Sequence, residues 1–200
     1  MPLLKTFPYG PDCRVALWQI TESEADFHAA FPHMEQLKTT LSHYRNTRRR
    51  LEILAAHALL YALTNDESLA IGHADNGQPV VDGFQISVSH TEGFAAIILS
   101  KAQAVGIDIE RRSDRVGRVA KRFIRPDEWT DDPTAQLILW SAKETVYKLR
   151  SNLSLEYFEM RALPFAVADE GTLRIEEHKA HTTMEVRFML TNSYVLTFSS

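Results

Sequence analysis

Each half of this 200-residue chain contains one long helix-forming segment that is followed by shorter strand-forming segments. Residues 48–63 are rich in leucine and alanine and end at a polar stop signal. Residues 133–149 begin with Asp132 as the expected N-cap and Pro133 in the first turn. Since a helix with an apolar face must bury it against another element, the pattern predicts an α+β protein. Each half should pack a long helix on a mainly antiparallel sheet.

Periodicity indicates the other elements. Residues 84–89 alternate apolar and polar side chains and residues 94–99 form an apolar run, so the turn at 91–93 predicts a hairpin. Pro32 should interrupt a helical region that spans residues 22–44. We also expect strands at 14–20, 105–110, 165–167, 172–176, 184–190 and 194–198, and an amphipathic basic helix at 112–125.

The midpoint of this pattern predicts two domains, residues 1–102 and 103–200. Both contain a long helix followed by strands and a closing hairpin. This order suggests two halves related by a pseudo-twofold axis. The repeat is topological, because the two halves do not align residue by residue.

Composition places the chain among soluble globular proteins. It is 44% apolar and 24% charged. Its net charge of −4 argues against a whole-surface nucleic-acid binder but allows local basic patches. The single cysteine, Cys13, excludes an internal disulfide and fits a reducing compartment. No apolar run approaches the ~20 residues that span a bilayer, and the first residues lack a secretory signal. We expect a cytoplasmic protein with no membrane or nucleic-acid partner.

Two carboxylates in the expected strand 105–110 are the first candidates for chemistry. Side chains alternate along a strand, so Asp108 and Glu110 share a face, roughly 6.6 Å apart. Two close negative charges are unfavourable unless a cation lies between them, and hard oxygen ligands suit Mg²⁺ or Mn²⁺. The alternative is an amphipathic edge strand with both acids in water.

The expected helix at 133–149 carries the second candidate. Trp140, Glu144 and Lys148 follow at i, i+4 and i+8, so they lie on one helix face and align an acid with a base. The alternative is a surface pair of Glu144 and Lys148, with Trp140 in the core.

A third candidate is the segment Ser89-His90-Thr91, where a histidine stands among hydroxyls at the junction of a strand and a turn. Such a site can bind phosphate, and the alternative is a solvated histidine. The chain has no Gly-x-Ser-x-Gly elbow, Walker loop, Gly-x-Gly-x-x-Gly loop or His-Glu-x-x-His helix. Their absence argues against several standard enzyme classes.

In combination these motifs resemble the 4′-phosphopantetheinyl transferases of the surfactin-synthetase-activating type. The resemblance rests on the order Ser89-His90-Thr91, Gly106-Ile107-Asp108-Ile109-Glu110, and Trp140-Ser141-Ala142-Lys143-Glu144 with Lys148. A Phe-x-x-x-x-Glu element at 123–128 and the opening Arg48-Arg49-Arg50-Leu51-Glu52 also match, and the likeness covers roughly residues 14–160.

The resemblance implies a fold of two α+β halves related by a pseudo-twofold axis. It also implies an enzyme that moves phosphopantetheine from coenzyme A to a serine hydroxyl of an acyl or peptidyl carrier protein. Adenosine 3′,5′-bisphosphate is released, and Mg²⁺ is required. The pathway is left open, although fatty acid biosynthesis is one candidate.

By the same resemblance, Asp108, Glu110 and Glu144 are expected to bind magnesium. Lys148 is expected to contact the pyrophosphate and to stabilise the leaving phosphate, so it is a catalytic as well as a coenzyme-binding candidate. The base toward the carrier serine is either Glu144 or a water held by the metal, and the sequence does not decide between them.

Coenzyme A itself is expected to contact the first half. Ser89 and His90 match the family's Ser-His motif, whose histidine contacts a phosphate of coenzyme A. Arg48 and Arg49 match a basic helix opening that suits the nucleotide end. The chain departs from the family pattern at Gln78, where a lysine is usual, and at His57, where an arginine is common.

An arginine stripe suggests how the carrier protein docks. The expected helix at 112–125 and its flank would align Arg111, Arg115, Arg118, Arg122 and Arg125, with Asp114 as the opposing charge. Carrier proteins present an acidic helix, and rim charges chiefly set association rate and specificity. The alternatives are a solvated helix and a contact to nucleotide phosphates.

Two other functions compete with the transferase. One is a non-catalytic relative that binds a carrier protein or nucleotide. The other is a two-metal phosphodiesterase or nuclease that uses the same carboxylates. The three carboxylates and Lys148 favour the transferase over the non-catalytic relative. The net charge of −4 and the scarcity of aromatic residues between the arginines at 111–125 count against a polynucleotide substrate. A monomer is expected.

Overall fold

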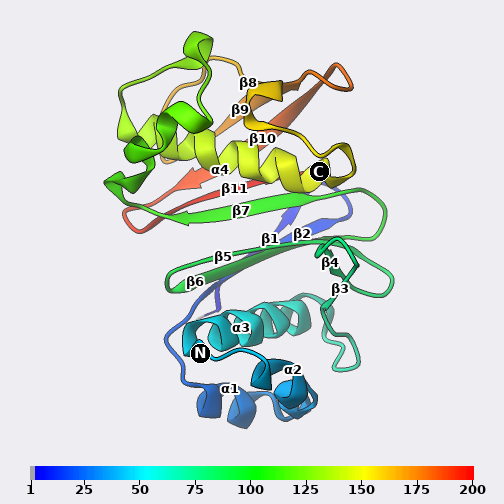
Figure 1. The fold of residues 1–200 in the computed structure, drawn as a ribbon. Helices are drawn as coiled ribbons and strands as arrows, with labels where there is room; N and C mark the ends of the chain where they lie inside the picture. Colours follow the sequence, from blue (N-terminus) through cyan, green and yellow to red (C-terminus); the bar gives the residue numbers. More distant parts are fainter. Residues whose placement is uncertain (1–2) are drawn as a thin grey trace. The chain divides into compact units, whose positions relative to one another are not determined.

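The computed structural model describes residues 3–200, so the first two residues of the predicted N-terminal domain lie outside the described part. The chain divides into two compact units between Gln103 and Ala104, one residue from the predicted boundary. Each unit is a mixture of helices and antiparallel strands (Figure 1). The predicted α+β class is therefore confirmed, while the pseudo-twofold relation stays a prediction.

The N-terminal unit is built on a four-stranded antiparallel sheet. Its strand order is β1 (Leu3–Tyr9), β2 (Cys13–Gln19), β6 (Phe94–Ser100) and β5 (Gln85–Thr91). The smaller elements are α1 (Glu24–Ala30), a 3₁₀ helix (Pro32–Leu37), α2 (Lys38–Ser42), and the short pair β3 (Gly72–His73) and β4 (Pro79–Val80). The hairpin of β5 and β6 and the interruption at Pro32 were predicted, whereas β1 was not.

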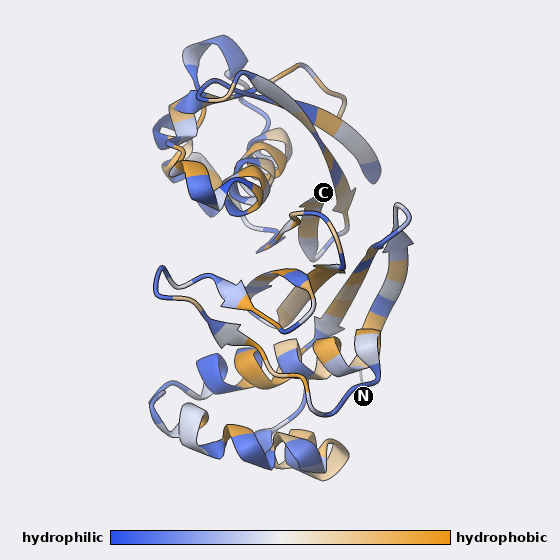
Figure 2. Ribbon diagram, turned by 90° about the vertical axis from the view of Figure 1, so that its right-hand side faces the viewer, coloured by the Kyte–Doolittle hydropathy of each residue, from blue (hydrophilic) through white to orange (hydrophobic). Residues whose placement is uncertain are grey.

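The long helix of this unit, α3 (Thr47–Thr64), packs on β2 and β6. Asn46 caps its start by accepting a hydrogen bond from the Arg48 amide, and Asn65 ends it in the left-handed conformation. Leu54 and Leu59 of the helix are fully buried in the core of the unit. In Figure 2, hydrophobic residues recur along this helix and along the strands.

The C-terminal unit has a five-stranded antiparallel sheet covered by one long helix, α4 (Pro133–Leu149). The strand order is β7 (Gly106–Arg111), β11 (Tyr194–Ser199), β10 (Thr182–Leu190), β9 (Glu170–Glu177) and β8 (Met160–Ala162). Short 3₁₀ helices lie at Asp114–Arg118, Ala120–Arg122, Pro126–Glu128, Ser151–Leu153 and Tyr157–Glu159. The predicted helix start is confirmed, since Asp132 accepts a hydrogen bond from the Thr134 amide.

A glycine allows β7 to approach α4 closely. A Cβ atom at Gly106 would overlap the carbonyl oxygen of Thr145, so any larger residue would force the strand and the helix apart. The contact places the side chains that follow along β7 against α4. The glycine therefore has a structural role directly beside the predicted carboxylates.

Two sequence expectations were wrong. Residues 112–125 do not form an amphipathic α-helix but contain two 3₁₀ turns. Burial of Val116, Ala120 and Phe123 decides the backbone path there, and Gly117 weakens a continuous helix. The strand expected at 165–167 is irregular, and β8 forms before it, because Pro164 lacks the amide hydrogen that a sheet ladder needs.

Among the described residues, no helix is long and apolar enough to cross a membrane.

Candidate functional site

The first predicted carboxylate, Asp108, is buried between β7 and α4. Its side chain lies on the face that meets α4, and the residue is only 3% exposed. Lys148 donates to its Oδ1 at 2.8 Å, and the Ser141 hydroxyl donates to its Oδ2 at 2.9 Å. Lys148 also donates to the carbonyl of Ile107 at 3.0 Å. Asp108 is therefore not a solvated acid on an edge strand.

Buried hydroxyls hold this carboxylate in place. Thr197 on β11 stands opposite Asp108 in the strand register. The hydroxyls of Ser141 and Thr197 are 2.8 Å apart, and those of Thr145 and Thr197 are 2.6 Å apart. All three residues are fully buried. Thr197 carries no recognisable signal in the sequence, because its role depends on pairing with a strand that lies far away in the chain.

Glu110, the second carboxylate on β7, is held by the tryptophan of the helix motif. Trp140 donates its indole N–H to Oε1 of Glu110 at 2.7 Å. Burial, together with the negative charges of Asp108 and Glu144, raises the pKa of Glu110 to about 7, although Trp140 and Lys148 oppose the rise. Trp140 thus does more than fill the core.

Glu144 is held by a residue that sequence analysis missed. The Tyr157 hydroxyl donates to Oε1 of Glu144 at 2.6 Å. Burial raises the pKa of Glu144, the Tyr157 hydrogen bond opposes this, and the charge of Asp108 adds to it. Tyr157 also packs its ring against Trp140, with centroids 5.3 Å apart. Tyr157 lies at the start of a short 3₁₀ helix outside the motif, so the sequence gave no signal for it.

Lys143, the motif residue next to Glu144, is entirely buried and pairs with Glu128. Its ammonium group also donates to the carbonyls of Phe123 at 2.7 Å and Tyr157 at 3.3 Å. Burial lowers the pKa of Lys143, while the pairing with Glu128 raises it. This contact explains the Phe-x-x-x-x-Glu element and ties the backbone of Tyr157 to α4.

The donor set fits a hard divalent cation. The negative charge of Asp108 raises the pKa of both Glu110 and Glu144, and a bound cation would relieve this repulsion. Within residues 3–200, however, no three such side chains already lie in a metal-holding arrangement. In this structure Lys148, Trp140 and Tyr157 contact the carboxylates instead. Magnesium binding stays a prediction.

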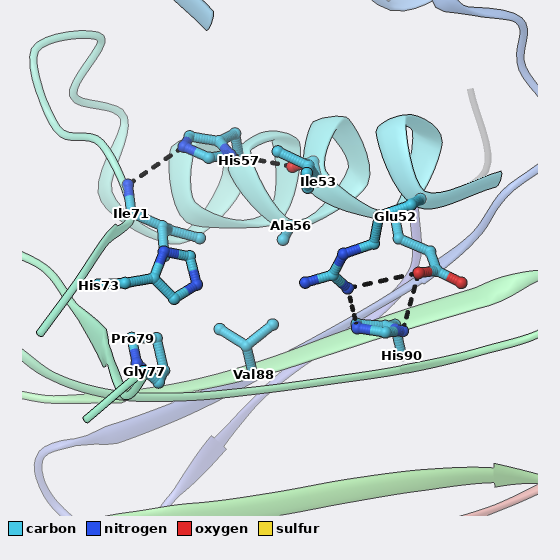
Figure 3. A pocket seen from close by; sticks show the side chains of 11 residues that line it. Glu52, Ile53, Ala56, His57, Ile71, His73, Gly77, Pro79, Val88 and His90 are labelled. Carbon is cyan, nitrogen blue, oxygen red and sulfur yellow. Dashed lines mark hydrogen bonds and ion pairs between the residues drawn. The ribbon is translucent and has the colours of Figure 1, made fainter. Parts of the chain in front are cut away.

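Three of the four predicted coenzyme-contacting residues of the N-terminal unit gather around Glu52, whose side chain is only 6% exposed. Arg48 pairs with Glu52 at 2.9 Å and Arg49 pairs with it at 3.4 Å. His90 pairs with Glu52 at 3.0 Å (Figure 3), and Arg49 also contacts His90. Burial alone would raise the pKa of Glu52, but the hydrogen bond and charge of His90 and those of Arg48 outweigh burial and hold it at about 2. Glu52 belongs to the arginine-rich motif, but no role was predicted for it.

This cluster forms one end of a pocket. Ile53, Ala56 and Val88 supply apolar walls, and Figure 3 shows them between Glu52 and the far end of the pocket. Ser89 does not line the pocket, because it is buried on the face of β5 opposite to His90. Its contact with coenzyme A stays a prediction.

His57 closes the far end of the pocket and has a structural role. Its Nδ1 lies 2.9 Å from the carbonyl of Ile53, and its Nε2 accepts the Ile71 amide at 3.1 Å. Because the amide only donates, Nδ1 carries the hydrogen. Burial lowers the pKa of His57. A neutral histidine thus joins α3 to the segment before β3 where the family often has an arginine.

The predicted arginine stripe is not a helix face. Arg111, Arg115, Arg118 and Arg122 are exposed but lie on β7 and on two separate 3₁₀ turns. Arg125 pairs with Asp127 at 2.9 Å and donates to the carbonyl of Phe158 at 2.6 Å. The basic residues therefore form a broken surface rather than a single line.

The C-terminal unit is thus an α+β domain whose long helix and first strand bring three carboxylates and a lysine together, a site suited to phosphoryl chemistry. Residues 104–199 match the family model of the 4′-phosphopantetheinyl transferase superfamily. The match supports the assignment of this unit to the superfamily without distinguishing a subfamily. The superfamily transfers phosphopantetheine to carrier proteins. No curated protein matches the chain significantly.

Proposed function

We propose that this protein transfers 4′-phosphopantetheine from coenzyme A to a serine of an acyl or peptidyl carrier protein. The observation that carries the proposal is the cluster of Asp108, Glu110, Glu144 and Lys148 in a unit that matches the transferase superfamily. The surfactin-synthetase-activating type is the subfamily that we propose, on the motifs of both units.

In the proposed reaction the carrier serine oxygen forms a bond to the β-phosphorus of coenzyme A. The pyrophosphate P–O bond breaks, and adenosine 3′,5′-bisphosphate leaves. Asp108, Glu110 and Glu144 would hold Mg²⁺, which would neutralise charge on the pyrophosphate.

The chain's own residues supply positioning and proton transfer. Glu144 accepts the serine proton, and Tyr157 fixes the orientation of its carboxylate through the 2.6 Å hydrogen bond. Lys148 stabilises the leaving phosphate, to which an ammonium group is well suited. In the N-terminal unit, Arg48, Arg49 and His90 bind a phosphate of the nucleotide end.

The carrier protein is proposed to dock on the exposed basic residues Arg111, Arg115, Arg118 and Arg122. Their exposure and shared sign favour an acidic partner surface. Arg125 is a weaker candidate than the sequence suggested, because Asp127 and a backbone carbonyl already engage its guanidinium group.

The test is the intact mass of a purified apo carrier protein after incubation with this protein, coenzyme A and Mg²⁺. We expect a gain of one phosphopantetheine group, no gain with Glu144→Gln, and a normal gain with Glu185→Gln, which removes an exposed carboxylate from the same unit. Coenzyme A binding without transfer to any of several carrier proteins would favour the non-catalytic relative. Hydrolysis of coenzyme A without a carrier would favour a phosphodiesterase.

A further inference from the structure

We propose that a chain of buried hydroxyls makes the metal site selective for Mg²⁺ over Ca²⁺, because it leaves Asp108 only one carboxylate oxygen for the cation. The hydroxyls belong to Thr145, Thr197 and Ser141. The inference rests on the proposed function, in which Asp108 is a magnesium ligand. It adds that Thr197 is a positioning residue, which acts on Asp108 through Ser141 and thereby sets which cation the site accepts.

The hydrogen bonds of this chain run in one direction. Asp108 pairs with the Lys148 ammonium group and, as a carboxylate, only accepts, so Ser141 gives its single hydroxyl hydrogen to Oδ2 at 2.9 Å. In its 2.8 Å hydroxyl contact with Ser141, Thr197 must therefore be the donor, and it also donates to the Ser141 carbonyl at 2.8 Å. Thr145 must then donate to the Thr197 hydroxyl at 2.6 Å. Each hydroxyl thus points along the chain toward Asp108.

The two carboxylate oxygens of Asp108 face different surroundings. The three hydroxyl residues are fully buried, and they hold Oδ2 on the closed side, among β7, α4 and β11. Oδ1 accepts from Lys148 at 2.8 Å, and the Lys148 side chain is 25% exposed. A cation that arrives from solvent therefore meets Asp108 at Oδ1. Because successive hydrogen bonds in a buried chain strengthen one another, Thr197 tightens the hold of Ser141 on Oδ2.

A single available oxygen suits Mg²⁺ better than Ca²⁺. Mg²⁺ demands near-octahedral geometry, keeps several water ligands and takes few carboxylates, whereas Ca²⁺ takes more oxygen ligands and can bind both oxygens of one carboxylate. A fixed Oδ2 denies Ca²⁺ this bidentate mode at Asp108 and does not hinder Mg²⁺. Without the hydroxyl chain, the carboxylate can turn about its last side-chain bond and present both oxygens to the larger ion.

The experiment measures the Kd values of MgCl₂ and CaCl₂ by calorimetry for wild type and Thr197→Val, without coenzyme A or a carrier protein. Valine has nearly the shape of threonine but lacks the hydroxyl, and Asp108 itself stays unchanged. We expect the ratio of the Kd for Ca²⁺ to the Kd for Mg²⁺ to fall roughly tenfold, the size expected when a partner of a metal ligand is lost. The matched control is Thr183→Val, which makes the same change at an exposed position of β10 and should keep the wild-type ratio.

Further variants separate positioning from damage to the fold. Thr197→Ser keeps a hydroxyl and should restore the wild-type ratio of Kd values. Thr145→Val acts one link further from Asp108, so it should lower the ratio less than Thr197→Val does. Near-UV circular dichroism of the metal-free variants checks their folding. If Thr197→Val fails to fold, Ser141→Ala replaces it, because it removes the direct donor to Oδ2, and the same loss of selectivity is expected.

Equal changes in the two Kd values of Thr197→Val, or a wild-type protein that binds Ca²⁺ as tightly as Mg²⁺, would overturn the inference. A wild-type protein that binds neither metal would overturn it together with the magnesium site of the proposed function. If the selectivity is present and Thr197→Val loses it, but wild type transfers no phosphopantetheine to any of several carrier proteins, the inference is supported and the proposed function is contradicted.

Discussion

The two units carry charged clusters of opposite design. In the N-terminal unit a buried carboxylate, Glu52, is surrounded by Arg48, Arg49 and His90, and its pKa falls to about 2. In the C-terminal unit three carboxylates crowd together, and the pKa of Glu110 rises to about 7. The first cluster therefore suits an anion and the second a cation. The proposed transferase would use the first cluster for a nucleotide phosphate and the second for a divalent metal.

The largest effect is expected at Asp108. Asp108→Asn keeps the size of the side chain but removes the charge that pairs with Lys148 and that is proposed to bind the metal. The rate of transfer should fall by ~100-fold or more, because the neighbouring residues cannot replace a lost metal ligand. Initial rates of phosphopantetheine transfer at saturating coenzyme A would measure this. Asp169→Asn, on the exposed turn before β9, is the control, and an equal loss there would contradict the assignment.

A smaller effect is expected at Tyr157. Tyr157→Phe keeps the ring that packs on Trp140 and removes only the hydroxyl that donates to Glu144. We expect kcat to fall roughly tenfold with little change in the KM for coenzyme A, the range expected for a lost charge-assisted hydrogen bond. Steady-state kinetics would show whether kcat falls while the KM for coenzyme A stays nearly unchanged. A change in KM alone would place Tyr157 in binding rather than in positioning Glu144.

The effect of losing the Trp140 indole donor should be smaller still. Trp140→Phe removes the 2.7 Å hydrogen bond to Glu110 but keeps an aromatic ring in the site. With that opposing contact gone, the pKa of Glu110 should rise further, so the magnesium affinity near neutral pH should fall by a few fold. Calorimetric titration with Mg²⁺ at pH 6.5 and pH 8.5 would test this, and equal affinity loss at both values would contradict it.

Sequence reasoning worked where local patterns decide the structure. The strand with Asp108 and Glu110 and the helix with Glu144 and Lys148 were predicted, because alternation and a proline-marked helix start are local signals. The approach of β7 to α4, which depends on Gly106, makes one cluster out of these two motifs.

Sequence reasoning failed where tertiary contacts determine the local structure. Tyr157 reaches Glu144 from the start of a 3₁₀ helix whose backbone carbonyl accepts a hydrogen bond from Lys143, and no periodicity marks such a residue. The basic segment 112–125 has helical spacing of its apolar residues, yet packing of Phe123 and its neighbours against α4 produces 3₁₀ turns instead. The sequence does not distinguish Glu52 from the other residues of its helix, because its role depends on burial next to His90.

The smallest expected effect concerns pH and stability. Because the pKa of Glu52 is lowered from 4.5 to about 2 in the folded protein, the unfolded chain binds more protons between these values. The stabilisation from Glu52 is therefore complete above pH 4.5 and is lost as the pH falls through about 2. Urea unfolding of wild type and Glu52→Gln at pH 6 and pH 2.5 should show a gap in unfolding free energy that narrows at the lower pH. An equal difference in unfolding free energy at both pH values would contradict the stabilisation of the fold by the ion pairs of Glu52.

The most direct test of the two opposed clusters is a crossed calorimetric titration. Wild type, His90→Ala and Glu110→Gln are each titrated with adenosine 3′,5′-bisphosphate and, separately, with Mg²⁺. The account predicts that His90→Ala weakens binding of the bisphosphate but not of Mg²⁺, and that Glu110→Gln does the reverse. Loss of both ligands in either variant, or no loss in both, would contradict the division of anion and cation recognition between the two clusters.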